Sequence, residues 1–119
     1  MSRMLILEPY LPTGQALAVI LERAGWHVTL VQTAHETLST LQQNTYDALL
    51  VDLDITTGDG WRVLQLLKPQ ANSLPIIAML GQESREHQRA RALGVRAVLP
   101  KPVDRQLLLA STSNLLQDA

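Results

Sequence analysis

The segment Tyr46–Leu53, with the sequence YDALLVDL, places a run of apolar residues directly before an aspartate, Asp52. Short apolar runs of this kind are typical of strands that are buried on both faces, as in parallel sheets. Similar runs flank it at residues 4–7, 28–31, 76–80 and 97–99. We therefore predict five buried strands, with Asp52 at the carboxyl end of the third.

Amphipathic stretches separate these runs. Residues 17–24 carry apolar side chains at helical spacing, and Thr33 with Glu36 has the pattern of a capping box at the start of a second helix. Further helices are predicted over residues 60–67, over residues 84–93 and after Asp104. Five β-α units in this order predict a three-layer α/β domain, with helices on both faces of a parallel sheet.

Composition narrows the class of protein. The chain has 119 residues, of which 46% are hydrophobic and 18% are charged, with no cysteine and a formal net charge of -1. This length favours one compact domain over residues 1–119. The absence of cysteine excludes disulfides and fits a cytoplasmic protein. No apolar run is long enough to span a membrane, and the near-neutral charge argues against direct nucleic-acid binding.

Charged residues end three of the predicted strands: Glu8, Asp52 and Lys101. The carboxyl ends of parallel strands meet at one edge of a sheet, where ligands bind. Two carboxylates close together favour a divalent cation such as Mg²⁺, and a lysine beside them suits a phosphoryl group. Residue types alone leave two interpretations open. One is a metal-assisted phosphoryl site with Asp52 as nucleophile, and the other is a purely structural ion network.

The whole chain resembles the receiver domain of two-component response regulators. The resemblance rests on residues 4–8, on residues 46–53 followed by Gly58-Asp59-Gly60, and on residues 74–77 and 94–102. It implies a flavodoxin-like (βα)5 three-layer sandwich with the parallel strand order 2-1-3-4-5. It also implies a cytoplasmic signalling module of a phosphorelay rather than an enzyme.

The same resemblance assigns roles to individual residues. Asp52 matches the aspartate that accepts a phosphoryl group from a histidine kinase or a phosphotransfer protein. Glu8, Asp52 and the backbone carbonyl of Asp54 match the groups that hold Mg²⁺. Lys101 matches the lysine that pairs with the phosphoryl oxygens, and the Lys101–Pro102 peptide is expected to be cis.

The sequence departs from the family pattern at three positions. Pro9 stands where a second metal-binding acid is usual, which weakens Mg²⁺ coordination. Leu80 stands where a Ser or Thr usually bonds the phosphoryl group, and Val98 where an aromatic ring usually moves inward. Two functions stay open: phosphorylation of Asp52 with an atypical switch, and a pseudo-receiver that acts as a phosphorylation-independent protein-interaction module.

A remote third function is suggested by Asp52 and Asp54, which follow an apolar run. This pair also resembles the first motif of haloacid dehalogenase-type phosphatases, where the first aspartate is the nucleophile and the second the general acid. That motif normally follows the first strand of its sheet, whereas two predicted strands precede it here. The sequence context therefore argues against a phosphatase.

Two surface features suggest protein contacts. The face formed by the fourth helix, fifth strand and fifth helix is a common dimer or output surface in the family, and the resemblance implies a homodimer or a partner contact there, beside Arg89 and Arg91. Trp61 opens the third helix, where exposure near the site and anchoring of a partner are both open interpretations.

Overall fold

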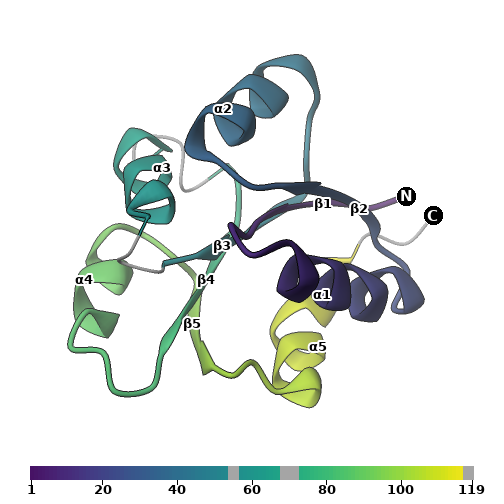
Figure 1. Cartoon of the computed structure of the whole chain (residues 1–119). Coiled ribbons are helices and arrows are strands. Elements are labelled where there is room, and N and C mark those ends of the chain that lie inside the picture. The colour runs from purple at the N-terminus through teal and green to yellow at the C-terminus, as the bar shows by residue number, and fades with distance from the viewer. Residues whose placement is uncertain (54–56, 68–72, 117–119) are drawn as a thin grey trace.

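The computed structural model describes residues 1–53, 57–67 and 73–116. Five strands alternate with five helices in this part of the chain (Figure 1). The strands are β1 (Arg3–Leu7), β2 (His27–Val31), β3 (Ala48–Asp52), β4 (Ile76–Gly81) and β5 (Ala97–Lys101). The helices are α1 (Leu11–Arg23), α2 (Ala34–Gln43), α3 (Asp59–Leu67), α4 (His87–Ala92) and α5 (Arg105–Ser113).

The strands form one parallel sheet in the order β2-β1-β3-β4-β5, as predicted. The strands β1 and β3 are neighbours in the sheet, and the order in which successive strands are added reverses between them. Residues in register include Leu7 with Val51 and Asp52 with Met79. Because all five strands run the same way, their carboxyl ends meet at one edge, where an α/β sheet usually binds its ligand.

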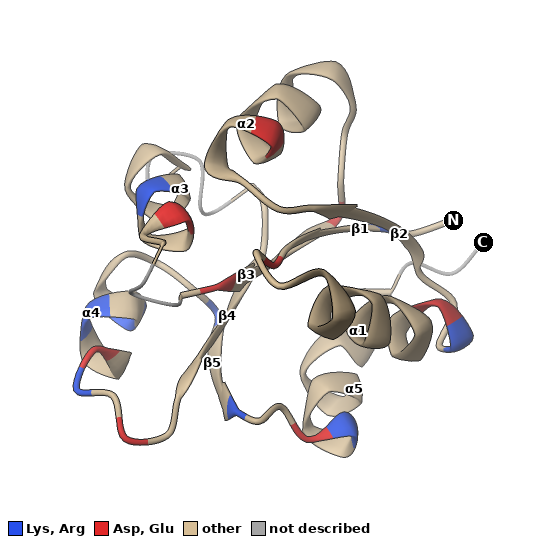
Figure 2. Ribbon diagram, viewed as in Figure 1, with Lys and Arg blue, Asp and Glu red and all other residues tan. Residues whose placement is uncertain are grey.

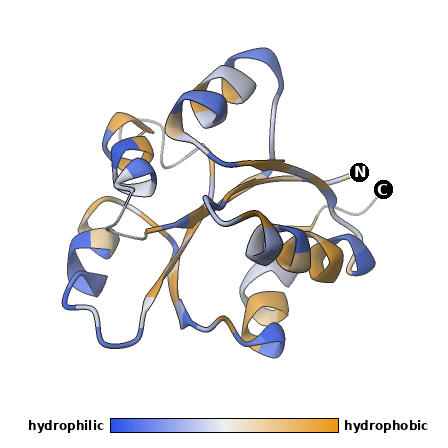
Figure 3. Ribbon diagram, in the orientation of Figure 1, coloured by the Kyte–Doolittle hydropathy of each residue, from blue (hydrophilic) through white to orange (hydrophobic). Residues whose placement is uncertain are grey.

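Two hydrophobic cores cover the two faces of the sheet. Leu5 and Leu7 point to the first core, which α2, α3 and α4 cover, and Met4 and Ile6 point to the second, which α1 and α5 cover. This alternation follows from the two-residue period of a strand. Both faces of the central strands are buried, so β1, β3 and β4 are mostly apolar between their ends, as Figure 3 shows.

Local sequence signals fix several helix ends. The Glu36 N–H donates to Thr33 Oγ1 at 3.1 Å, and the Leu107 N–H donates to Asp104 Oδ2 at 3.0 Å, which confirms both predicted caps. Gly25 and Gly94 follow α1 and α4 with φ of 108° and 95°. Glycine adopts this conformation without steric cost, so both helices end there.

Helix α4 is shorter than predicted. The sequence suggested a helix over residues 84–93, whereas α4 covers only His87–Ala92. The Ser84 N–H donates to the Gly81 carbonyl at 3.1 Å, and Ser84 Oγ accepts from the Glu86 N–H at 3.1 Å. These turn contacts compete with helical hydrogen bonds over residues 84–86.

Among the described helices, none has the length and apolarity to cross a bilayer.

Candidate phosphoryl-acceptor site

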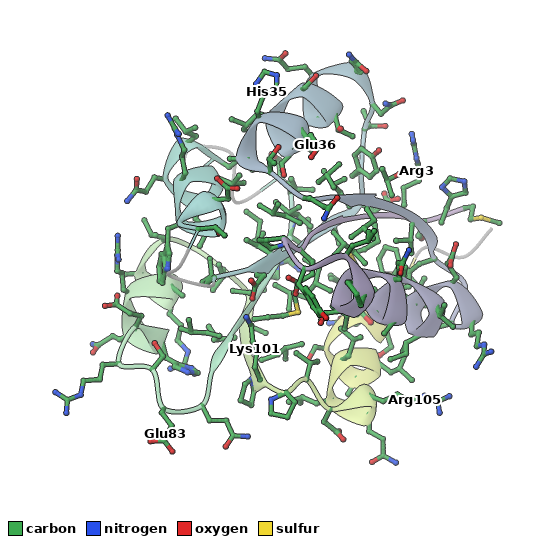
Figure 4. The ribbon with its side chains drawn as sticks, viewed as in Figure 1. Arg3, His35, Glu36, Glu83, Lys101 and Arg105 are labelled. Carbon is green, nitrogen blue, oxygen red and sulfur yellow. The ribbon has the colours of Figure 1, made fainter. Side chains whose placement is uncertain are left out.

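An ion pair between Asp52 and Lys101 lies at the carboxyl edge of the sheet. Asp52 ends β3 and is 2% exposed, and Lys101 ends β5, with β4 between them. The Lys101 ammonium contacts Asp52 Oδ1, while the lysine side chain keeps 31% of its surface exposed. Figure 4 shows Lys101 directed toward the middle of the sheet rather than into solvent. Because a buried carboxylate needs compensation, the lysine stabilises the charged form of Asp52.

Glu8 brings a second carboxylate to this edge. It follows β1 directly and is 4% exposed. Its N–H donates to the Val31 carbonyl at 3.1 Å, which extends the pairing of β1 with β2 by one residue. Its Oε2 accepts from the Tyr10 N–H at 3.0 Å, so the turn into α1 orients the carboxylate. Glu8, Asp52 and Lys101, together called the acceptor cluster below, line one cavity.

This cavity has a volume of about 680 Å³, which is within the usual range for binding sites in proteins. Its floor is the acceptor cluster and Met79. Its walls are mostly apolar and come from α1, with the residue before it, and from the segment between β5 and α5. They consist of Tyr10, Pro12, Thr13, Ala16, Leu17, Ile20, Pro102 and Val103. The Lys101–Pro102 peptide in this wall is cis, as expected.

The donor groups of the acceptor cluster fit a magnesium ion. Two carboxylates and one ammonium carry a formal net charge of -1, and Mg²⁺ is usually bound through one or two carboxylates plus water. Pro9 adds no side-chain oxygen, and its carbonyl accepts from Gln32 Nε2 at 3.1 Å. Asp54, the third predicted metal contact, lies outside the described residues. The described residues hold no group of three or more acidic or histidine side chains able to bind a metal.

Leu80 and Val98, called the relay positions below, are apolar and packed in the first core. Leu80 is 3% exposed and Val98 is half-buried against the same cluster. Neither side chain has a hydrogen-bonding group, so neither can bond to an anion on Asp52. Leu80 also lines a second cavity of about 570 Å³ under the segment between β4 and α4, and Lys101 lines both cavities.

Sequence reasoning found the three charged members of the site but not its surroundings. The structure brings Glu8, Asp52 and Lys101 into one cavity, as predicted. It also reveals a contact that the sequence did not suggest, in which the Arg89 guanidinium lies over the Trp61 ring at 4.3 Å from its centroid. The two residues are 28 positions apart, on α3 and α4, so no local pattern could have linked them.

The strand order defines a flavodoxin-like α/β domain. Glu8 and Asp52 lie at the carboxyl edge of its sheet, at the switch point between β1 and β3. The family model described as "response regulator receiver domain" matches residues 6–113. The chain therefore belongs to the receiver domains of two-component response regulators. Receiver domains are signalling modules, which agrees with the sequence context that argued against a phosphatase.

Individual relatives agree with this assignment. The transcriptional regulatory protein PcoR of Escherichia coli is 27% identical over 120 residues, covering 100% of this chain and 53% of PcoR. The sensory/regulatory protein RpfC of Xanthomonas campestris is 31% identical, covering 95% of this chain and 16% of RpfC. The chain thus spans about half or less of these two relatives.

Solved structures show the same fold. A sensor protein from Polaromonas sp. JS666 is 27% identical with a TM-score of 0.82, covering 97% of this chain and 98% of that one. The receiver domain of the TMAO respiratory response regulator TorR has a TM-score of 0.88 at 19% identity, covering 97% and 96% of the two chains. The second likeness is evidence for the fold alone.

Proposed function

We propose that this domain accepts a phosphoryl group on Asp52 from a phosphohistidine of a histidine kinase or a phosphotransfer protein. The observation that carries the proposal is the ion pair between buried Asp52 and Lys101, on the floor of a cavity that also holds Glu8. A carboxylate is a suitable nucleophile toward phosphorus when nearby cations neutralise the incoming charge. The role is stoichiometric, with one phosphoryl group held per domain rather than turnover of a substrate.

The proposed transfer forms one bond and breaks one. A carboxylate oxygen of Asp52 bonds to phosphorus while the N–P bond of the phosphohistidine breaks. The electron pair of that bond stays on the imidazole nitrogen, and the ring leaves neutral when its other nitrogen carries a proton. The Lys101 ammonium, now on Asp52 Oδ1, turns toward the phosphoryl oxygens of the product.

The metal site belongs to the same proposal. Glu8 and Asp52 would hold Mg²⁺, and the Asp54 carbonyl is the third contact that the family pattern assigns. When bound, Mg²⁺ supplies two positive charges and so favours the approach of a phosphoryl dianion. Glu8 is pre-oriented by the Tyr10 N–H, which limits the reorganisation that binding requires. Because Pro9 contributes no carboxylate, we expect weaker Mg²⁺ binding than a site with three acidic ligands would have.

The shape of the cavity suggests how a donor protein reaches Asp52. Its walls are α1 and the segment before α5, so a phosphohistidine that enters it brings its own helix against those walls. Helix α1 carries no charged residue before Glu22, and Figure 2 shows this length of ribbon without charge. We infer an apolar contact with the donor along α1. A donor loaded from ATP also places the domain in the cytoplasm.

A phosphorylation-independent interaction module is the second candidate. Pro9 removes a metal ligand, and Leu80 removes the hydroxyl that would sense the phosphoryl group. The same fold would then present a fixed surface to its partner. The intact pairing of Asp52 with Lys101 favours the first candidate, since a module without phosphoryl chemistry has no need for a buried ion pair that costs desolvation energy.

Self-association through α4, β5 and α5 stays a prediction. Arg91 is exposed on α4, whereas Arg89 lies over Trp61 and 3.4 Å from Glu86, so it is partly engaged within the chain. We expect charge reversal at Arg91 to weaken the dimer more than reversal at Arg89. Sedimentation at high protein concentration measures this, and a monomer at every concentration would overturn the prediction.

Labelling with acetyl phosphate tests the proposed function. Intact-protein mass spectrometry after incubation with acetyl phosphate and Mg²⁺ should show one phosphoryl adduct. The adduct should be lost in Asp52→Asn and on chelation of Mg²⁺, but kept in Asp59→Asn, a nearby aspartate on α3. Persistent absence of an Asp52-dependent adduct, together with no Mg²⁺ binding by calorimetry, would leave the interaction module as the function.

A further inference from the structure

The start of α3 packs directly against the backbone of Asp52. A Cβ atom on Gly60, the second residue of α3, would overlap the Asp52 carbonyl oxygen and lie 3.0 Å from a methyl carbon of Leu53. Glycine is therefore required here for close approach rather than for an unusual backbone angle. Because the contact is rigid on both sides, a shift of the Asp52 backbone must move the first turn of α3.

The next residue connects α3 to α4. Trp61 is 6% exposed, and its indole N–H has no hydrogen-bond partner among the residues that the structure describes. The Arg89 guanidinium covers the ring at 4.3 Å, and Arg89 Nη1 lies 3.4 Å from Glu86 Oε2. The Arg89 side chain is 50% exposed, so its pair with Glu86 adds little, and the stacking on the buried Trp61 ring is the contact that links α3 to α4.

The residues that precede α4 line the same cavity as Lys101, a member of the acceptor cluster. Glu86 and Lys101 both line the second cavity, under the segment between β4 and α4. His87 holds that segment to the sheet, since its Nε2 lies 2.9 Å from the Gly81 carbonyl oxygen. Asp52 is thus linked to α4 through its backbone by way of α3, and Lys101 and Glu86 face the same cavity without a direct contact being part of the path.

We propose that Gly60, Trp61 and Arg89 transmit the state of Asp52 to α4, in place of the relay positions. Leu80 has no hydroxyl and Val98 no ring, so the usual path along β4 and β5 is closed. Gly60 is the positioning residue packed on the acceptor backbone, Trp61 is the next residue of the same helix, and Arg89 carries the movement to α4. The physiological trigger, phosphorylation, rests on the proposed function, but the coupling itself does not.

The response of Trp61 to a change at Asp52 can be compared with that of Trp26, the other tryptophan of the chain. Trp26 is 3% exposed in the second core, and its indole N–H also has no partner in the described parts of the chain. Protein labelled with 5-fluorotryptophan gives one ¹⁹F resonance for each ring, and Trp26→Phe assigns them. Asp52→Asn weakens the ion pair with Lys101 without any ligand. We expect this substitution to shift the Trp61 resonance and to leave that of Trp26 in place.

The role of Arg89 is tested in ¹⁵N-labelled protein. Asp52→Asn should shift the backbone amide signals of α4, and most of that shift should be lost when Arg89→Gln is added. Arg91→Gln, an exposed change on the same helix, should leave it intact. An unmoved Trp61 resonance, or α4 shifts that are equal with and without Arg89, would overturn the coupling.

The two proposals fail separately. Mg²⁺ with beryllofluoride, a mimic of the acyl phosphate, is added to the wild-type domain. If no adduct forms while Asp52→Asn still moves Trp61 and α4, phosphorylation is refuted and the coupling stands. If an adduct forms on Asp52 and Trp61 and α4 stay still, the coupling is refuted and the acceptor role stands.

Discussion

The acceptor cluster lies at the carboxyl edge of the sheet and the relay positions lie within the neighbouring strands β4 and β5, and the two groups have opposite character. Glu8, Asp52 and Lys101 are charged and face a cavity, whereas Leu80 and Val98 are apolar and pack in the first core. The chain keeps the groups suited to accept a phosphoryl group and lacks those that usually sense it. Acceptance and readout are therefore separable, and each can be tested alone.

The largest expected loss of stability is at the contact between the Asp52 backbone and Gly60 of α3. Gly60→Ala forces the Asp52 carbonyl and α3 apart, and we expect a loss of about 3 kcal/mol in the free energy of unfolding. Urea denaturation measures it. Gly81→Ala is the matched control, because a Cβ there meets no atom within 4 Å. Equal stability of the two variants would show that α3 does not press on Asp52.

Removal of the cation from the acceptor cluster should have the next largest effect. Lys101→Met removes the cation that pairs with the buried Asp52 carboxylate, and we expect a cost of about 2–3 kcal/mol. Adding Asp52→Asn should recover much of this loss in a double-mutant cycle. Arg105→Met, on the first turn of α5, should cost far less. Additive losses from Lys101→Met and Asp52→Asn would contradict an ion pair that stabilises the fold.

Restoring a hydroxyl at the first relay position should harm the core. Leu80→Thr removes buried methyl groups and introduces a polar group, so we expect a loss of about 2 kcal/mol. Val98→Thr, at the half-buried position, should cost less than about 1 kcal/mol by the same denaturation measurement. If Leu80→Thr left stability unchanged, the end of β4 would have room for a hydroxyl, and the contrast between the two regions would be weaker than described.

The smallest expected effect is at the contact between α3 and α4. Arg89→Gln removes the cation over Trp61, and we expect a loss of about 0.5–1 kcal/mol. Arg91→Gln should be close to neutral, because Arg89 and not Arg91 is the arginine that covers the Trp61 ring. Thermal unfolding of the two variants side by side measures the difference. Identical midpoints would mean that the ring contact contributes nothing to stability.

Most of the fold was predictable, because its signals are local. The apolar runs located the strands, and Thr33 and Asp104 marked the starts of α2 and α5. The strand order came from the family resemblance, since periodicity does not determine which strands are neighbours. The extent of α4 was wrong, because polar residues 84–86 fit a helix in composition but are bonded as a turn.

The site was predictable only in part. Residues at the ends of buried strands, such as Asp52 and Lys101, must meet once the sheet is parallel, so their position in the sequence was sufficient. The Tyr10 N–H that orients Glu8 and the stacking of Arg89 on Trp61 depend on how helices pack in three dimensions. Neither contact has a pattern along the chain, so neither was found from the sequence.

A crystal structure with Mg²⁺ and beryllofluoride is the decisive test of Asp52 as the phosphoryl acceptor. We predict beryllium bonded to a carboxylate oxygen of Asp52, Mg²⁺ bound by Glu8 and Asp52, and the Lys101 ammonium moved from Asp52 Oδ1 to a fluorine. Leu80 should stay buried. A structure obtained with both reagents in excess that shows the Asp52–Lys101 pair unchanged, with no beryllofluoride on Asp52, would contradict the assignment of this residue as the phosphoryl acceptor.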